Sequence, residues 1–166
     1  MKNNKLNKKA ISGFYTAFQK NNAEGMIKYY HDDIEFEDPA FGKLKGDRAK
    51  NMWRMLSEVG KGNIKVTYKN IHIDGDKGSA EWEAIYNFSE TGREVHNKVK
   101  ANFEFKDGLI YKHIDSFDLW AWSKMALGGF TGYVLGFTPI FKNKLNIETN
   151  KKLDQFIEKR QAQGLK

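Results

Sequence analysis

Four long segments in which polar and apolar residues alternate, within residues 63–118, constrain the fold of this chain more than any other feature. Side chains of a strand point alternately to its two faces, so each segment predicts a β-strand with one apolar face. Short turns that contain glycine join the segments, at DGDKG, ETGR and KDG. Such turns between alternating strands predict an antiparallel meander. In the first segment the apolar parity changes between Tyr68 and Ile71, which predicts a bulge near residues 69–70.

Helical periodicity dominates the sequence before the meander. Apolar residues at helical spacing predict helices at residues 5–20, 21–30 and 46–62, and a strand, DDIEFEDP, lies between the last two. Helices followed by a run of strands predict an α+β fold.

Short polar residues mark the ends of several helices. Asn22, Asp47 and Asp118 each precede an apolar helical pattern, and a side chain of this kind can accept a hydrogen bond from the first helical turn. Asp118 would begin a short helix, LWAWSKMALG, and residues 150–161 predict a final amphipathic helix.

The composition narrows the possible sites. A chain of 166 residues forms one domain large enough to bury about two thirds of its unfolded surface. It has no cysteine, which excludes disulfides and thiolate metal sites. The four histidines, at 31, 72, 96 and 113, lie on separate elements, and no glycine-rich phosphate loop occurs. We therefore expect neither a metal nor a cofactor.

The net charge of +7 lies mainly in the two ends of the chain. Residues 1–9 and residues 142–166 each contribute +4, and the body between them is at −1. A nucleic-acid-binding domain more often carries its charge on a face of the body, so nucleic acid is not an expected partner. The charged beginning, MKNNKLNKKA, lacks the apolar stretch of a secretory signal, and we expect a cytoplasmic protein.

The stretch IEFEDPAFG, residues 34–42, places an acid among apolar residues. Alternation puts Asp38 on the same strand face as Ile34 and Phe36. Asp38 is then either an acid or base in an apolar pocket, or a turn residue ahead of Pro39. The pattern alone leaves both interpretations open.

Two phrases carry a resemblance to a known family. YYHDDIEFEDPAFGKLKG leading into a helix, and DGLIYKHIDSFDLWAW after the meander, resemble the NTF2-like superfamily, and in it the SnoaL-like and ketosteroid-isomerase-like branch. The resemblance covers about residues 5–128. It implies a cone in which a curved antiparallel sheet wraps around N-terminal helices and leaves a pocket at its open end. We thus expect a domain at 1–128 and an extension, 129–166, formed by an apolar segment with a basic helix packed on it.

The resemblance places Asp38 on the position of the proton-shuttling aspartate of the isomerases, within Glu-Asp-Pro. The other isomerase groups do not carry over. The tyrosine position of the first helix falls on Phe14, with Tyr15 one place away, and the second aspartate position falls on Ala101. Steroid isomerisation by that mechanism is therefore not expected.

The last strand offers a replacement. His113, Asp115 and Phe117 share a face that the resemblance turns into the cone. We predict Asp38 as the base, with His113 and Asp115 as partner acid or positioning group. In the alternative, His113 is a core histidine and Asp115 pairs with a basic residue at the rim. The predicted ligand-binding residues are Phe14, Tyr15, Phe18, Tyr30, Trp53, Trp82, Asn97, Ala101, Phe117 and Trp120.

Two functions fit these features. The first is a cofactor-free isomerase, dehydratase, cyclase or epoxide hydrolase that acts on a small apolar molecule. The second is a non-catalytic ligand-binding or dimeric association module, since one fold can host both. The superfamily often pairs through its sheet, which implies a homodimer.

The run MALGGFTGYVLGFTPIF, residues 125–141, has no charge, and Gly128, Gly132 and Gly136 recur every four residues. Its length and Pro139 argue against a membrane span. Three interpretations stay open: a lid on the pocket, a dimer contact, and peripheral contact with a membrane that attracts the basic tail.

Overall fold

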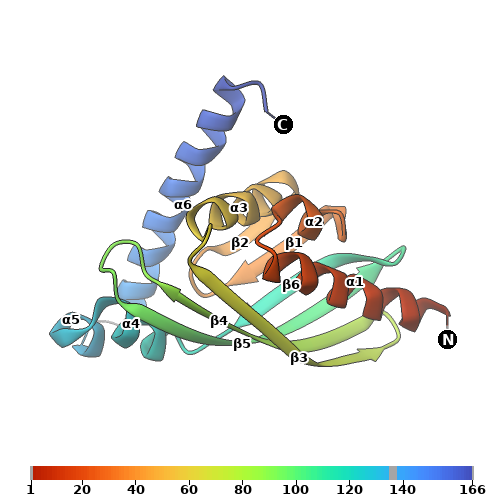
Figure 1. Cartoon of the computed structure of the whole chain (residues 1–166), viewed down its shortest axis with the longest axis horizontal. Helices are drawn as coiled ribbons and strands as arrows, with labels where there is room; N and C mark the ends of the chain where they lie inside the picture. The colour runs from red at the N-terminus through yellow and green to blue at the C-terminus, as the bar shows by residue number, and fades with distance from the viewer. Residues whose placement is uncertain (1, 135–137, 166) are drawn as a thin grey trace.

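The computed structural model describes residues 2–134 and 138–165. A six-stranded sheet and six helices make up these residues (Figure 1). In chain order they are α1 (Lys2–Gln19), α2 (Ala23–Ile27), β1 (Tyr30–Asp38), β2 (Gly42–Lys45), α3 (Gly46–Val59), β3 (Ile64–Asp74), β4 (Lys77–Asn87), β5 (Glu94–Lys106), β6 (Leu109–Ser116), α4 (Leu119–Leu127), α5 (Gly129–Val134) and α6 (Pro139–Ala162).

The strands are arranged in the order β2-β1-β6-β5-β4-β3. The meander of β3 to β6 is antiparallel throughout, as the alternating segments predict. A register shift between Lys69 and His72, with Asn70 at a φ of 55°, confirms the predicted bulge. The predicted α+β cone is confirmed. One pairing differs from the expected antiparallel sheet, because β1 lies parallel to β6.

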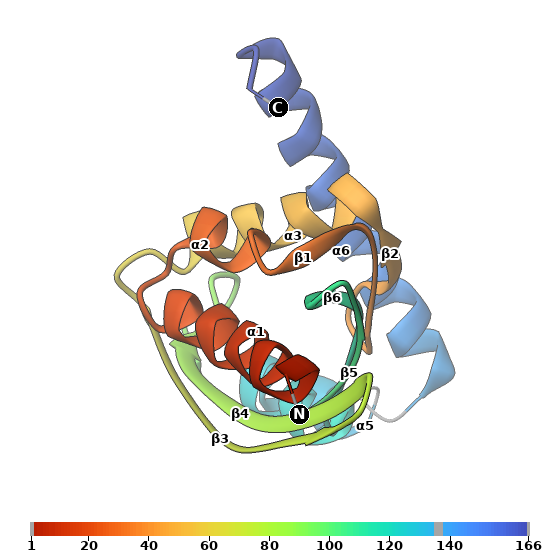
Figure 2. The ribbon, with the colours of Figure 1, turned by 90° about the vertical axis from the view of Figure 1, so that its right-hand side faces the viewer.

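The sheet curls around α1, which lies in its concave face (Figure 2). Burial follows the alternation of the strands, so that in β5 Val95, Asn97, Val99, Ala101, Phe103 and Phe105 face inward. Aromatic side chains fill the space between α1 and the sheet. Phe14 stacks on Tyr30, and Tyr15 stacks on Tyr68. Burial of such large apolar side chains is the main stabilising contribution to this layer.

Two of the three predicted caps are confirmed. The side chain of Asn22 accepts a hydrogen bond from the Gly25 amide, and that of Asp118 accepts one from the Ala121 amide. The prediction for Asp47 is wrong. Gly46, at a φ of 52°, makes the sharp turn out of β2, so α3 begins two residues earlier than a cap at Asp47 would allow, and Asp47 lies inside its first turn.

The C-terminal helix is longer than predicted. It begins at Pro139 rather than near residue 150, and the Thr138 hydroxyl caps it by accepting from the Phe141 amide. It packs on α3, and its Leu153 side chain is fully buried in the main apolar core. Gly136, part of the predicted glycine repeat, lies outside the described residues. Of the helices described, none is both long and apolar enough to cross a membrane.

Candidate functional site

A cavity of about 930 Å³ opens at the end of the sheet where β1 and β6 finish. Its walls come from β4, β5 and β6 on one side and from α3, α4 and α6 on the other. Most of the wall is apolar, including Phe18, Phe36, Met52, Trp53, Trp82, Phe117 and Trp122. The polar groups of its deep side are few: Asp38, Asp115, Asn97 and Tyr86. An apolar cavity with a few convergent polar groups is the usual form of a small-molecule site.

Two of these groups, Asp38 and Asp115, lie on neighbouring strands at the same level. The parallel ladder pairs Phe36 with His113 and Glu37 with Ile114. Continued by one residue, this register sets Asp38 beside Asp115, with their strands about 4.8 Å apart. Both side chains point to the concave face, because each lies two residues beyond an inward-facing aromatic ring. The sheet therefore presents a pair of carboxyl groups to the cavity.

Asp38 is held in a tight turn and also faces the cavity. Its Oδ1 accepts hydrogen bonds from the amides of Ala40, at 3.0 Å, and Phe41, at 2.6 Å. Burial, with a smaller contribution from the nearby Asp115, raises the pKa of Asp38 to about 7, although the amide hydrogen bonds act to lower it. Some solvent reaches the side chain through the cavity, but protein atoms surround the carboxyl group closely. Asp38 is thus a turn residue that also lines the apolar cavity.

The turn after Asp38 is fixed from outside by α6. Asn146 donates to the carbonyls of Pro39 and Ala40, at 2.9 and 2.5 Å, and Asn150 donates to the carbonyl of Phe41 at 2.8 Å. The amides of this turn bind the Asp38 carboxylate while its carbonyls bind the helix. As a result the C-terminal extension helps to position the candidate acid.

Asp115 is oriented by two donors of the inner layer. Its Oδ1 lies 2.9 Å from Nε2 of His113 and accepts from Nε1 of Trp82 at 3.2 Å. The chain continues behind His113, whose Nδ1 lies 2.7 Å from the hydroxyl of Tyr30. That hydroxyl accepts from Nε1 of Trp53 at 2.8 Å. The buried side chains of His113, Trp82, Tyr30 and Trp53 therefore hold one oxygen of Asp115 in place. The other oxygen is left on the side of the carboxyl group that faces the cavity.

One assignment of the hydrogens gives every group in this chain a partner. An indole N–H can only donate, so the Tyr30 oxygen accepts from Trp53 and its own hydrogen is available for Nδ1 of His113. His113 then carries its proton on Nε2 and donates it to Asp115. In this neutral tautomer every polar group of the chain has a partner. His113 thus lies one layer behind the cavity wall, where its ring contacts Asp115.

The predicted site residues fall into three groups. Asp38 and Asp115 line the cavity, as do Phe18, Trp53, Trp82, Asn97 and Phe117. Four others lie in the core behind it: His113, Tyr30, Phe14 and Tyr15, all fully or almost fully buried. Ala101 is buried too, and it pairs with Asp115 across β5 and β6, so a carboxyl group lies next to position 101 on the adjacent strand.

Trp120 lies away from the cavity, contrary to its place in the predicted wall. It is 41% exposed, and its Nε1 donates to the carbonyl of Tyr133 at 3.1 Å. The reason is that α4 turns its other side, with Trp122, toward the sheet. In that position Trp122 donates to the Tyr86 hydroxyl at 2.9 Å. The helical pattern of LWAWSKMALG alone did not distinguish the two tryptophans.

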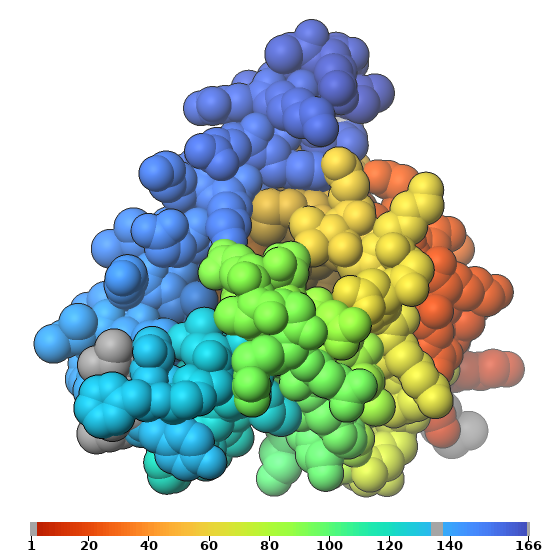
Figure 3. All heavy atoms as spheres, turned by 60° about the vertical axis from the view of Figure 1, so that its left-hand side comes forward, coloured from red at the N-terminus to blue at the C-terminus, as the bar shows by residue number. Residues whose placement is uncertain are grey.

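The mouth of the cavity was not predicted from the sequence. Lys144, Glu148 and Lys152 of α6 line it, and Lys152 forms an ion pair with Glu90 of the loop between β4 and β5. This face is shown in Figure 3, where α6 (blue) lies next to the loop (green). The charged residues of α6 have no motif that would mark them, because a charged helix face ordinarily contacts solvent alone.

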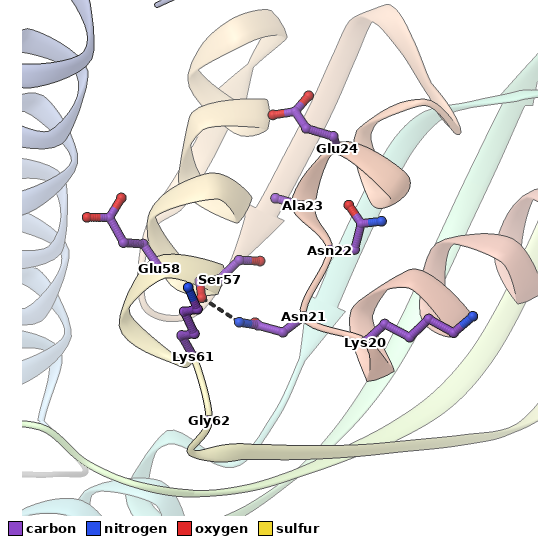
Figure 4. A pocket seen from close by; sticks show the side chains of 9 residues that line it. All are labelled: Lys20, Asn21, Asn22, Ala23, Glu24, Ser57, Glu58, Lys61 and Gly62. Carbon is purple, nitrogen blue, oxygen red and sulfur yellow. Dashed lines mark hydrogen bonds between the residues drawn. The ribbon is translucent and has the colours of Figure 1, made fainter. Parts of the chain in front are cut away.

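A second hollow, about 520 Å³, lies between α3 and the linker from α1 to α2 (Figure 4). It is lined mainly by residues with exposed charged or polar ends, such as Lys20, Glu24, Glu58 and Lys61. Asn21 donates to the Ser57 carbonyl across its floor at 2.6 Å. It contains no pair of buried acids, so the first cavity is the better candidate. Within the described residues, no three His, Asp or Glu side chains cluster in a way that could hold a metal ion.

Comparison with known proteins supports the same fold. A family model described as SnoaL-like domain matches residues 11–113. No curated protein matches the chain. Among solved structures, TerC co-crystallised with polyporic acid superposes with a TM-score of 0.63 at 18% identity, over 72% of this chain and 97% of that one.

Two further structures show the same likeness. A putative polyketide cyclase from Xanthomonas campestris pv. campestris gives a TM-score of 0.59 at 15% identity, over 72% of this chain and 96% of that one. An epoxide hydrolase from M. tuberculosis, described as LEH-like, gives 0.60 at 23% identity, over 80% and 97%. Identities this low establish a shared fold and leave the chemistry to the residues of the site.

Proposed function

Since this chain belongs to the SnoaL-like family, we propose that it is a cofactor-free acid/base enzyme that acts on a small apolar molecule held in the cavity. The observation that carries the proposal is the pair of carboxyl groups, Asp38 and Asp115, side by side in an apolar wall. Two acids in different environments can take opposite roles at the same pH.

The different environments of the two acids support opposite roles for them. Asp38, with a pKa of about 7, is protonated in about half of the molecules near neutral pH and can act as the acid. Oδ1 of Asp115 is already bonded to Trp82 and His113, and we assign the role of base to its second oxygen. This reverses the roles predicted from the sequence, in which Asp38 was the base.

Each turnover moves two protons. The second oxygen of Asp115 takes a proton from the ligand, or from a water that attacks it, and Asp38 donates its proton to the ligand oxygen or carbon that becomes negative. The step leaves Asp115 protonated and Asp38 ionised, so the proton returns between the adjacent carboxyl groups before the next turnover. Isomerisation, dehydration, ring closure and opening of an epoxide by water all need this pair of transfers.

Ligand binding without turnover is the second candidate function. It is favoured by the hydrogen bonds that already occupy Oδ1 of each aspartate. In that case the two acids would serve to shape the cavity, and the apolar wall alone would select the ligand.

One experiment distinguishes these functions. A set of small apolar ketones, epoxides and alcohols is screened by thermal shift, and each compound that binds is tested for conversion by mass spectrometry. In Asp38→Asn and Asp115→Asn we expect turnover to fall about a hundredfold or more while binding stays within a few fold. Glu148→Gln, at the mouth, is the matched control and keeps turnover. Binding without conversion by the unaltered protein would establish the second function, and undiminished turnover in both aspartate variants would exclude the first.

A further inference from the structure

The α4–α5 hairpin exposes an aromatic surface that the proposed reaction does not use. α5 packs on α4 through Gly132, where a Cβ atom would lie 2.6 Å from the Ser123 carbonyl oxygen. This close contact turns the other side of α5 outward. Phe130 is 80% exposed and Tyr133 is 60% exposed, and Trp120 of α4 adjoins Tyr133. We call these three residues the aromatic face.

One basic side chain lies against the aromatic face, and two more follow it at the start of α6. The Nζ atom of Lys124 lies 3.8 Å from the centre of the Trp120 ring and 5.7 Å from that of Tyr133. Across residues 119–147, which include α4, α5 and the start of α6, there are three lysines and no acid. Two of these lysines, Lys142 and Lys144, are exposed on α6. The hairpin thus combines large apolar rings with charge of one sign.

We propose that the aromatic face binds the surface of an anionic lipid membrane. Tryptophan and tyrosine favour the boundary between headgroups and acyl chains, and an exposed phenylalanine gains free energy by entering it. The lysines of the hairpin and of α6 are drawn to acidic headgroups at the same surface. The contact is peripheral, through side chains of a short hairpin.

The charge of the hairpin argues against a second copy of this chain as its partner. In a two-fold contact each patch meets the same patch of the other copy. Lys124 would then lie near its counterpart, and the nearest acids in the sequence, Asp118 and Glu148, lie outside the hairpin. An anionic bilayer is complementary to both parts of this surface, because its acyl chains are apolar and its headgroups are negatively charged.

The position of the hairpin gives this contact a use. Leu127 and Thr131, which belong to the same hairpin, also line the cavity. In Figure 3 α4 and α5 (cyan) lie at the end of the molecule where α6 and the loop between β4 and β5 meet. A membrane bound here would lie beside the cavity, so an apolar molecule dissolved in the bilayer could enter without crossing water. The membrane contact itself does not depend on the proposed acid/base chemistry.

The test is co-sedimentation with liposomes. Full-length protein is mixed with vesicles of phosphatidylcholine alone or of phosphatidylcholine and phosphatidylglycerol in equal parts. We expect binding to the mixed vesicles, weakened by 0.5 M NaCl, which shortens the Debye length to about 4 Å.

Phe130→Ser with Tyr133→Ser is expected to reduce the partition coefficient about tenfold or more, since two exposed rings are lost. Lys124→Gln with Lys142→Gln should act mainly on the anionic vesicles.

Two controls keep the result specific. Leu6→Ser removes an exposed apolar side chain from α1, and Lys8→Gln with Lys9→Gln removes two lysines from it. Both are expected to leave binding unchanged. Absence of sedimentation, or equal sedimentation of the Phe130/Tyr133 variant, would overturn the proposal. So would a dimer in light scattering that this variant dissociates, or nucleic acid that binds the hairpin and displaces it from vesicles.

Discussion

Asp38 combines two roles that usually belong to different residues. Its Oδ1 closes a turn by accepting two amide hydrogen bonds, and its carboxyl group also borders an apolar cavity. Burial disfavours the charged form by more than the two amides favour it, so its pKa rises to about 7. The turn fixes the group in place, and the apolar surroundings keep it partly protonated near neutral pH. The amides of the turn therefore hold this candidate acid in position before a ligand binds.

Replacement of Asp38 by asparagine should change how stability depends on pH. The pKa of Asp38 is about 7 in the folded state and about 3.9 in the unfolded chain. Between these values the folded state holds a proton that the unfolded state has lost, so this group makes the protein less stable as pH rises from about 4 to 7. The variant Asp38→Asn keeps a side-chain oxygen for the turn and loses this dependence.

We expect Asp38→Asn to be more stable than the unaltered protein at pH 8, by roughly 2–4 kcal/mol, with the two curves converging toward pH 4. Urea unfolding at several pH values measures the difference. Parallel curves would contradict the elevated pKa and with it the assignment of Asp38 as the acid.

The Tyr30 hydroxyl is expected to matter for stability as well as for the site. In Tyr30→Phe, Trp53 and His113 each lose a buried hydrogen-bond partner, which should lower the free energy of unfolding by about 1–3 kcal/mol. Tyr15→Phe is a matched control. The Tyr15 hydroxyl is buried without a hydrogen-bond partner among the described residues, so its removal should be neutral or slightly stabilising. If thermal unfolding shows the same loss of stability in both variants, the hydrogen bonds of Tyr30 make no particular contribution to the stability of the protein.

At the scale of elements, the features that could be predicted from the sequence are those that local chemistry determines. Alternation sets the faces of β3 to β6, a change of parity reveals the bulge near Asn70, and the short acceptors at 22 and 118 cap their helices. The faces of β1 and β6 likewise placed Asp38 and Asp115 among inward residues. Each of these depends on neighbours within a few positions of the chain.

The elements that escaped prediction depend on contacts between distant segments. The parallel pairing of β1 with β6 joins residues more than 70 positions apart, and it alone sets the two carboxyl groups side by side. The short strand β2 exists because it pairs with β1, and the first turns of α6, PIFKNKLN, are helical although their sequence has no clear apolar periodicity. Tertiary contact overrides local propensity in such segments. The role of His113 behind Asp115 was left open for the same reason.

At the scale of the whole molecule, the C-terminal helix is joined to the body by contacts of several kinds. Arg48 of α3 bonds to Asp154 at 2.5 Å and to Asn150 at 2.8 Å. Asn146 and Asn150 bind the turn that carries Asp38. Leu153 lies in the same apolar cluster as Trp53 and Phe36 of the cavity wall. We therefore expect α6 to unfold together with the cone rather than as a separate unit.

A core substitution in α6 tests this cooperativity. Leu153 has no exposed surface, so Leu153→Ala should lower the free energy of unfolding by about 2–5 kcal/mol through lost burial and the space left behind. Ile147→Ala, on the same helix but 67% exposed, should change it by less than about 0.5 kcal/mol.

Urea unfolding is followed by circular dichroism, which reports the helices, and by tryptophan fluorescence, which reports the body. Because one cooperative unit gives coincident transitions, Leu153→Ala should shift both midpoints equally. A shift confined to the helical signal would show that α6 is only loosely attached, and it would remove the structural basis for its part in positioning Asp38.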